Sequence, residues 1–346
     1  MSSYGLRGCL LSWTERFLVD RSQSVKVGTS NSVKSKVVCG IPQGSVLGPI
    51  LFLIYINDLP ELVKSTVKLF ADDTKIYSKV AGDDDCKILQ DDLDSLSLWS
   101  DKWLLRFNAS KCKSLHIGRQ NPKHDYYMSS EGDTVQIQKT SQEKDLGVTF
   151  DDKLRFDVHI ANCVKKANQR LGLIRRSFEY MDCQMFLVLY KSLVRPILEY
   201  ATVIWSPWLK KDIIAIEQVQ RRATKLVKDI HHLSYEERLL KLGLPTLIYR
   251  RERADMVQMF KILSKFDEVH LKTLNLRSNS NTRGHDLKLV KRHHNYKGSM
   301  NCFTTRCSNP WNSLPTECVK SKTVNTFKGN LNTAWKRKPN NFLYKF

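Results

Sequence analysis

The chain has 346 residues, 41% of which are hydrophobic, and a formal net charge of +21 at pH 7. This hydrophobic content supports a packed core of about two domains and excludes a wholly disordered chain. Residues 201–346 hold 28 Lys and Arg against 11 Asp and Glu, so the positive charge is concentrated in the C-terminal half. A surplus this uneven predicts a polyanionic partner, nucleic acid above all, rather than only a solvated surface.

The sequence predicts neither secretion nor a membrane span. Its most apolar run, residues 50–56, is far shorter than the ~20 residues that cross a bilayer, and the N-terminus has no apolar signal segment. Nine scattered cysteines favour a reducing compartment over a disulfide framework. We therefore expect an intracellular protein, nuclear or cytoplasmic, with no membrane partner. The one possible zinc-binding group in the sequence consists of Cys302, Cys307, Cys318, His293 and His294. Their spacing matches no common zinc site, so we interpret these residues as structural.

The first third of the chain mixes predicted helices and strands. Residues 5–19 have apolar side chains at helical spacing, and valines around a polar turn predict short strands over residues 25–38. Pro49 to Leu62 predicts a buried helix entered at a proline. Residues 67–79 predict two short strands around a tight Asp-Asp turn, and residues 86–105 predict an amphipathic helix.

Further strands are predicted at residues 115–117 and 146–150, and from residue 157 to about 265 the pattern is mostly helical, with a break near Trp205–Trp208. The last 80 residues are polar and basic, with weak periodicity. This order predicts an α+β fold. We expect an antiparallel sheet with helices in residues 1–157, a helical region in 158–265 and a basic C-terminal region in 266–346.

Asp72 and Asp73 are the strongest candidates for metal ligands. Mg²⁺ prefers oxygen ligands, and nucleotidyl transfer uses two divalent ions about 3.5–4 Å apart. A tight turn would present both carboxylates at an exposed sheet end. The alternative is ordinary turn chemistry, because adjacent aspartates also occur at residues 83–85, 91–92 and 151–152.

The context of this pair comes from residues 40–52, GIPQGSVLGPILF. Gly40 and Gly44 flank Pro42 and Gln43, so the backbone can turn sharply and approach a ligand closely. Alone, such a turn is more often a simple loop. Followed about 20 residues later by FADD, it makes a specific signal.

A basic helix is predicted over residues 211–228, with Arg221, Lys225 and Lys228 recurring along one face. Such a stripe could follow a phosphate backbone. A solvated helix face explains the same three residues equally well.

These segments resemble motifs B and C of reverse transcriptases, closest to the jockey/CR1-like non-LTR (LINE-type) retrotransposons. Residues 103–118 are similar to motif D, and residues 144–160 are similar to motif E and the start of the thumb. Residues 184–227 are similar to the helical region that follows the polymerase. The resemblance implies a partial right-hand polymerase palm, with a helical, thumb-like region after it, that copies RNA into DNA with Mg²⁺ or Mn²⁺. Its partners would be an RNA template, a DNA primer and deoxynucleoside triphosphates.

The resemblance also implies a role for individual residues. Asp72 would be a metal ligand and Asp73 its neighbour, while Phe70 and Ala71 would lie beneath the primer terminus. Pro42, Gln43 and Gly44 would contact the incoming nucleotide and the template. Lys111 matches the motif D lysine that is proposed to protonate the departing pyrophosphate, although a solvated loop lysine is an equal alternative. Leu146 and Gly147 would belong to the primer grip.

One family feature is missing from these 346 residues. Motif A, whose aspartate ligates both metals, would precede residue 4, and neither Glu15 nor Asp20 has its sequence context. The fingers motifs and the N-terminal endonuclease are missing too. We therefore expect an N-terminally truncated product or a fragment of a longer polyprotein, inactive alone. The alternative is a catalytically dead nucleic-acid-binding remnant of such an element.

Overall fold

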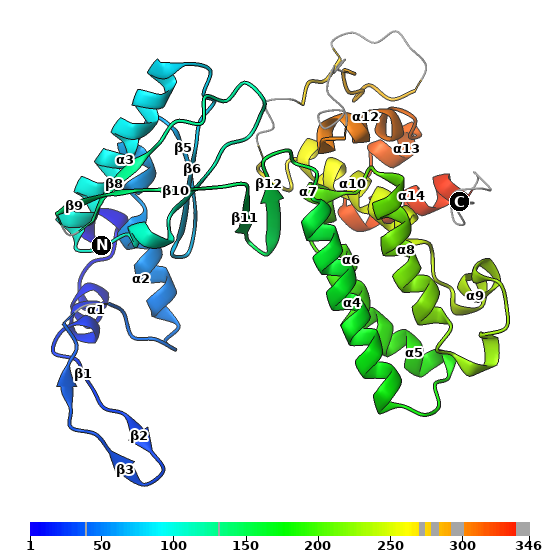
Figure 1. Ribbon diagram of the computed structural model, residues 1–346, viewed down its shortest axis with the longest axis horizontal. Coiled ribbons are helices and arrows are strands. Elements are labelled where there is room, and N and C mark those ends of the chain that lie inside the picture. The colour runs from blue at the N-terminus through cyan, green and yellow to red at the C-terminus, as the bar shows by residue number, and fades with distance from the viewer. Residues whose placement is uncertain (39, 131, 270–273, 278–283, 292–300, 337–346) are drawn as a thin grey trace. The chain divides into compact units, whose positions relative to one another are not determined.

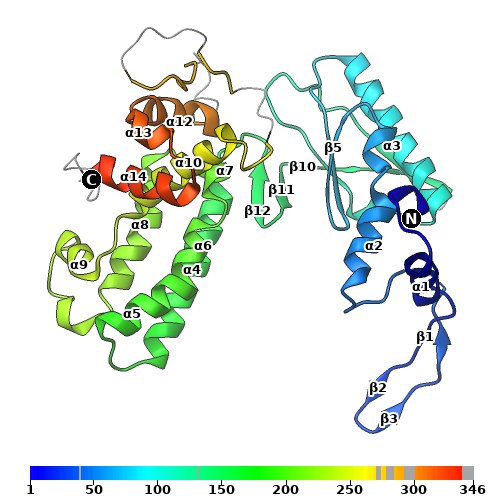
Figure 2. The same ribbon diagram turned by 180° about the vertical axis from the view of Figure 1, so that it is seen from behind.

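The computed structural model describes residues 1–38, 40–130, 132–269, 274–277, 284–291 and 301–336. The chain divides into two compact units, Met1–Thr140 and Ser141–Phe346. We describe each unit by itself. Figures 1 and 2 label their helices and strands from opposite sides.

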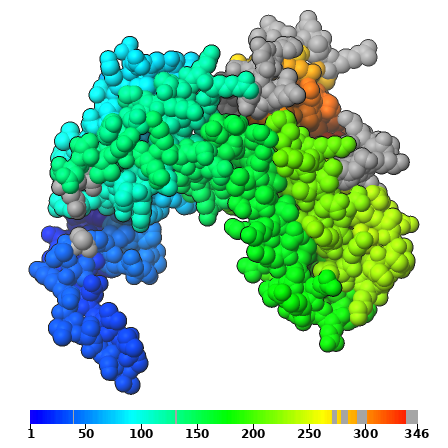
Figure 3. All heavy atoms as spheres, in the orientation of Figure 1, coloured from blue at the N-terminus to red at the C-terminus, as the bar shows by residue number. Residues whose placement is uncertain are grey.

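Unit 1 contains helices and short two-stranded ribbons. In chain order its elements are η1 (Ser2–Tyr4), α1 (Cys9–Leu18), β1 (Ser22–Gln23), β2 (Lys26–Val27), β3 (Ser30–Asn31), β4 (Ser35–Lys36), α2 (Leu47–Ile56), η2 (Leu59–Leu62), β5 (Thr66–Phe70), β6 (Asp73–Tyr77), α3 (Asp83–Trp103), η3 (Ala109–Lys111), β7 (Lys113–Leu115), β8 (Tyr127–Ser130), β9 (Asp133–Gln136) and β10 (Gln138–Thr140). The β1–β4 and β2–β3 pairs form one exposed ribbon that extends away from the rest of this unit (Figure 3).

Helix α3 and the β5–β6 hairpin form the core of unit 1. Leu93, Leu96 and Trp99 of α3 are buried in the same cluster as Val67 of β5. Asp92 of α3, itself only 4% exposed, accepts hydrogen bonds from the backbone N–H groups of residues 64 and 65, at 2.9 and 2.8 Å. These bonds satisfy a buried carboxylate and fix the start of β5 against the helix.

Helix α2 differs from its prediction in both its bounds and its burial. It begins at Leu47, two residues before the expected proline, and ends at Ile56. One side is buried, but Val46, Ile50 and Leu53 are 88%, 50% and 52% exposed. The spacing of these three residues places them along one helical stripe. Apolar residues occur on every face of this helix, so the sequence does not predict which face packs against the described part of unit 1.

Unit 2 is mainly helical. Its elements are β11 (Gln142–Asp145), β12 (Val148–Asp151), α4 (Asp157–Ser177), α5 (Cys183–Leu189), the π-helical turn η4 (Tyr190–Val194), α6 (Arg195–Glu199), α7 (Thr202–Trp205), α8 (Lys210–Thr224), η5 (Lys228–Ile230), α9 (Tyr235–Leu242), α10 (Leu247–Leu263), α12 (Phe303–Asn312), α13 (Thr316–Val319) and α14 (Val324–Lys336). The predicted helical stretch and its break after Trp205 are confirmed.

Two hydrophobic clusters lie in unit 2. The first joins helices α4 to α9 and includes Val148 of β12. The second joins α10 to the C-terminal helices through Phe260, Trp311 and Phe327. The weak periodicity of the last 80 residues gave no prediction of helices there, but residues 303–336 form three helices. Cys307 and Cys318 are buried in this second cluster, in line with a structural role, while His293 and His294 lie outside the described residues.

The described chain has the predicted order of mixed elements followed by helices. Its strands pair only two by two, and β7–β10 is parallel, so the described residues do not form one continuous antiparallel sheet. The predicted boundary at residue 157 differs from the division at Thr140–Ser141, and the three-part division stays a prediction. Within the described ranges, no helix combines the length and apolar character needed to cross a membrane.

Candidate functional site

Asp72 and Asp73 lie at the tip of the β5–β6 hairpin, as predicted. The strands pair in antiparallel register from Thr66↔Tyr77 to Phe70↔Asp73, so Ala71 and Asp72 form a two-residue turn and Asp73 begins β6. Val67, Leu69 and Ile76 turn towards the core, while Phe70, Ala71, Asp72 and Asp73 are all exposed. The side-chain alternation of the two strands therefore directs Phe70 and Asp73 to the solvent-facing side.

Ala71 has a backbone φ of 51°. This left-handed conformation costs a residue with a Cβ roughly 1–2 kcal/mol. Glycine would adopt it without that cost. Strain of this kind is frequent at functional sites, and here it forms part of the turn that exposes Asp72.

In each of the other runs of adjacent aspartates, one member has a structural explanation. Asp92 holds the start of β5, as described above, and Asp85 accepts a hydrogen bond from the Ala81 N–H at 2.7 Å. Asp151 accepts hydrogen bonds from the N–H groups of Lys153, Arg155 and Phe156. Within the part of the chain that the structure describes, by contrast, the carboxylates of Asp72 and Asp73 accept no hydrogen bond and make no ion pair. They are thus available to an external ligand.

The glycine-rich turn before α2 is folded back against the start of that helix. The Ser45 hydroxyl donates to the Pro42 carbonyl at 2.8 Å and accepts from the Gly48 N–H at 3.0 Å. A Cβ at Gly48 would meet both of these oxygens at 3.0 Å, so the close approach requires glycine. Gly44, with a φ of 79°, permits the turn itself. Gln43 and Gly44 are exposed and Pro42 is half-buried.

Lys111, the candidate from motif D, ends the short helix η3. The Asn108 side chain caps this turn by accepting from the Lys111 N–H, and the lysine side chain is exposed. Among the described residues, no hydrogen bond or ion pair joins it to Asp72 or Asp73. Its role stays a prediction.

Leu146 and Gly147, the candidates for the primer grip, form the turn of the β11–β12 hairpin in unit 2. Both have positive φ, 43° and 85°, as a two-residue hairpin turn of type I′ requires. The Tyr200 hydroxyl donates to the Leu146 carbonyl at 2.8 Å. The Tyr200 ring also lies where a Cβ at Gly147 would meet it at 3.3 Å. Tyr200, which the sequence did not single out, therefore supports this turn.

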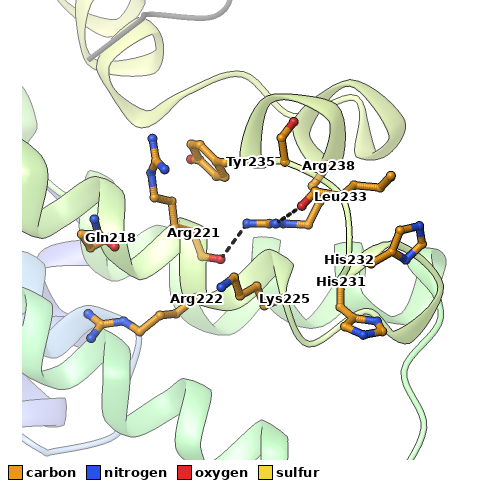
Figure 4. Close-up of a pocket in the computed structure, with 10 residues that line it drawn as sticks. Gln218, Arg221, Arg222, Lys225, His231, His232, Leu233, Tyr235 and Arg238 are labelled. Carbon is orange, nitrogen blue, oxygen red and sulfur yellow. Dashed lines mark hydrogen bonds between the residues drawn. The ribbon is translucent and has the colours of Figure 1, made fainter.

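The predicted basic stripe is interrupted. Helix α8 ends at Thr224, not at residue 228, and Lys225 is its C-cap. Lys228 lies in η5 with its Nζ 5.6 Å from the centre of the Tyr180 ring. Arg221 and Lys225 instead line a pocket between α8 and α9, together with Arg222, His231 and His232, which the sequence had not singled out (Figure 4). The three lysine and arginine candidates therefore do not share one helix face.

The carboxylates of Asp72 and Asp73 fit a divalent cation in chemistry but do not complete its site. They are exposed oxygen donors without competing partners, as a hard cation requires. Over the described ranges, however, no group of three or more His, Cys, Asp or Glu side chains could hold a metal ion. Two carboxylates from one turn approach a cation from one side only, so further ligands have to come from elsewhere.

Comparison with known proteins agrees with this geometry. Residues 3–150 match the family model described as "Reverse transcriptase (RNA-dependent DNA polymerase)". The match includes the glycine-rich turn, the Asp72–Asp73 hairpin and Lys111. This segment is therefore similar to reverse transcriptase domains. No solved structure matches the chain.

The similarity also covers part of unit 2 and extends to RNA-directed DNA polymerases of mobile elements. The chain is 29% identical over 229 residues to a probable RNA-directed DNA polymerase from transposon BS of Drosophila melanogaster, covering 62% of this chain and 25% of that protein. It is 27% identical over 234 residues to the RNA-directed DNA polymerase from mobile element jockey of the same species, with shares of 61% and 24%. The chain thus spans about a quarter of these homologues.

Proposed function

We propose that this chain contributes the reverse transcriptase domain of a non-LTR retrotransposon polymerase, which copies an RNA template into DNA from a DNA primer. The observation that carries the proposal is the pair of exposed, unpartnered carboxylates at the β5–β6 tip, within a segment that matches the reverse transcriptase family. The polymerase relatives of the chain support the same reaction. The proposed site of action is the nucleus, where such an element would meet its target DNA.

In this proposal Asp72 is a metal ligand, assisted by Asp73. Bound Mg²⁺ or Mn²⁺ would activate the primer 3′-hydroxyl and offset the charge of the triphosphate. Exposed Phe70 and Ala71 support the primer terminus, and Pro42, Gln43 and Gly44 contact the deoxynucleoside triphosphate and the template base. Lys111 donates a proton to the leaving pyrophosphate, and Leu146 with Gly147 holds the primer. In this proposal unit 1 is part of the palm of a right-hand polymerase, and unit 2 is its thumb.

A second function has its own supporting observation. Because the described residues gather no third metal-ligating side chain with Asp72 and Asp73, the 346-residue chain could act only as a nucleic-acid-binding protein. Two divalent ions close together repel each other and need a bridging carboxylate to offset that repulsion. We therefore propose that polymerisation requires a further aspartate from outside the described residues.

The test compares metal binding with catalysis. Asp72→Asn should weaken Mn²⁺ binding, measured by electron paramagnetic resonance, by at least about tenfold. Mutating a residue that only hydrogen-bonds to a metal ligand already lowers metal affinity about tenfold or more. Asp91→Asn is the matched control, because Asp91 is exposed and also belongs to an adjacent aspartate pair. The control should bind Mn²⁺ as the wild-type chain does. Equal Mn²⁺ binding by wild type and Asp72→Asn would contradict the metal role.

Primer extension on an RNA template, with Mg²⁺ and then Mn²⁺, separates the two functions. We expect no extension by the 346-residue chain above the level of Asp72→Asn. If extension occurs in the wild-type chain and is lost in Asp72→Asn, the chain completes its own metal site and the binding-only function is wrong.

A further inference from the structure

The pocket between α8 and α9 is strongly basic. Its volume is about 440 Å³, and ten residues from α8, the η5–α9 connection and α9 line it. Four of them carry permanent positive charge, two are histidines and none is acidic: Arg221, Arg222, Lys225, Arg238, His231 and His232. Figure 4 shows these side chains around one cavity.

Buried Arg238 is the fixed part of this pocket. It is 3% exposed, and its guanidinium donates to the Leu233 carbonyl at 2.6 Å, the Thr224 hydroxyl at 3.0 Å and the Arg221 carbonyl at 3.4 Å. Burial lowers the pKa of this guanidinium, which still remains charged at neutral pH. Because its partners are neutral oxygens, two in the last turn of α8 and one just before α9, its charge is not cancelled by a hydrogen-bonded carboxylate.

Among the acids around the pocket, Glu236 pairs with a pocket cation, while Asp229 and Glu237 accept hydrogen bonds from other groups. Asp229 accepts from the Tyr180 hydroxyl, and Glu237 accepts from the Ser234 N–H in the capping box of α9. Glu236 approaches Arg221 at 3.8 Å. Within the described part of the chain, exposed Arg222 and Lys225 have no acidic partner. Ser234 and Tyr235 also bring the N-terminal, positive end of the α9 dipole to the pocket wall.

The aromatic residue of the pocket favours contact with phosphate rather than with a base. The Tyr235 ring is 5% exposed and is covered by the Arg221 guanidinium, 4.4 Å from the ring centre. The Tyr235 ring therefore offers no open face for a nucleobase to stack on, whereas the cations that line the pocket can contact a phosphate oxygen.

We propose that the α8–α9 pocket binds the phosphodiester backbone of a nucleic acid without reading its bases, with Arg222 and Lys225 as the contacting cations and Arg238 as the fixed charge behind them. The choice of nucleic acid as the source of phosphate rests on the proposed function. The pocket replaces the helical stripe: Lys225 contacts the backbone and Lys228, held against Tyr180, does not.

The test measures binding of fluorescently labelled single-stranded RNA to the full chain as a function of salt. Arg222→Gln/Lys225→Gln should weaken binding by roughly tenfold or more and make the log–log salt dependence shallower by about 1.4, since each lost contact removes about 0.7 for a single strand. Lys165→Gln/Lys166→Gln removes the same charge from exposed positions on α4 and should change binding far less. Lys228→Gln should leave binding unchanged.

Equal losses in the α4 and pocket variants would overturn the proposal, because binding would then follow net charge alone. The charge-preserving change Arg222→Lys/Lys225→Arg should retain binding, and its failure would count against a backbone contact. A labelled deoxynucleoside triphosphate and inorganic phosphate form the second arm. If these bind through Arg222 and Lys225 while RNA binding is unaffected, the pocket takes small phosphates and the nucleic-acid proposal is wrong.

The pocket and the polymerase proposal can fail separately. Asp72→Asn should retain full RNA binding, and the pocket variant should retain Mn²⁺ binding. If the pocket variant loses RNA binding but Mn²⁺ binding does not depend on Asp72, the pocket proposal is supported and the proposed polymerase site is wrong.

Discussion

Individual acidic residues in this chain differ in what their carboxylates contact. Asp92 and Asp151 satisfy backbone N–H groups, and Glu199 and Asp255 pair with arginines. Asp72 and Asp73 are exposed at a turn, where a carboxylate contributes little to stability. A carboxylate that the fold does not need can be kept for a ligand, and this contrast separates the candidate site from the other aspartate pairs.

Ala71→Gly tests the strain at that turn. Relief of the left-handed alanine should exceed the extra entropy lost by glycine on folding, so we expect a gain of about 0.5–1 kcal/mol in the free energy of unfolding of unit 1. Urea denaturation measures it. Ala81→Gly, at an exposed position without positive φ, is the control and should destabilise slightly. A loss of stability in both variants would show that Ala71 is not strained.

At the scale of single residues, the sequence located the Asp72–Asp73 turn and the glycine-rich turn because rare residue types at fixed spacing mark them. It did not locate Arg222, His231, His232 or Tyr200. Their positions depend on where α8 ends and how distant segments pack, and no local pattern encodes either.

Among the elements, α10 and α12 are joined by a buried ion pair. The Arg306 guanidinium donates to both Asp255 carboxylate oxygens at 2.8 Å and to the carbonyls of Val203 and Asn301. The two side chains are 16% and 8% exposed. One arginine therefore links the C-terminal helices to α10 and to the end of α7.

Arg306→Met should destabilise unit 2 by about 3–5 kcal/mol, because it leaves Asp255 buried without its partner. Lys320→Met is the matched control. The Lys320–Asp286 pair is 3.3 Å long but 58% and 67% exposed, so its loss should change stability by less than about 1 kcal/mol. Thermal unfolding followed by circular dichroism measures both changes. Similar effects in the two variants would refute the special role of burial.

The elements were predicted unevenly for physical reasons. The 3.6-residue periodicity of α3, α4 and α8 is strong, and those helices were predicted. The end of α8 carries no Gly or Pro, and the chain turns there because Val227 enters the core with 0% exposure. Residues 303–336 are rich in Asn, Ser and Thr, so their helical periodicity is weak. The helical i, i+4 pairs Cys307 with Trp311 and Phe327 with Leu331 were therefore missed, although all four residues are buried.

For the whole molecule, the division into units has an experimental consequence. Both clusters of unit 2 consist of residues from Val148 onward, so residues 141–346 contain a complete core. We expect this segment, expressed alone, to unfold cooperatively and to bind RNA through the α8–α9 pocket. Circular dichroism and the RNA assay check this, with Arg222→Gln/Lys225→Gln as the control for specific binding. A segment without cooperative unfolding would show that unit 2 depends on unit 1.

The sequence predicted the order of mixed elements followed by helices, and the domain boundary at residue 157 stays a prediction. The boundary expected at residue 157 followed the family pattern of strands, whereas Val148 packs into the helical cluster. Alternation along a strand shows which side is apolar, but it cannot show which of two cores will bury that side.

The register of the β5–β6 hairpin has a consequence for the mutations that this turn can tolerate. The pairing that buries Val67 and Leu69 also points Phe70 and Asp73 outward. Deleting the codon of Leu69 would shift Val67 and Lys68 by one pairing position relative to the turn, which exchanges their faces and brings Lys68 towards the core. A three-nucleotide, in-frame deletion that leaves every aspartate in place can therefore disrupt the Asp72–Asp73 turn.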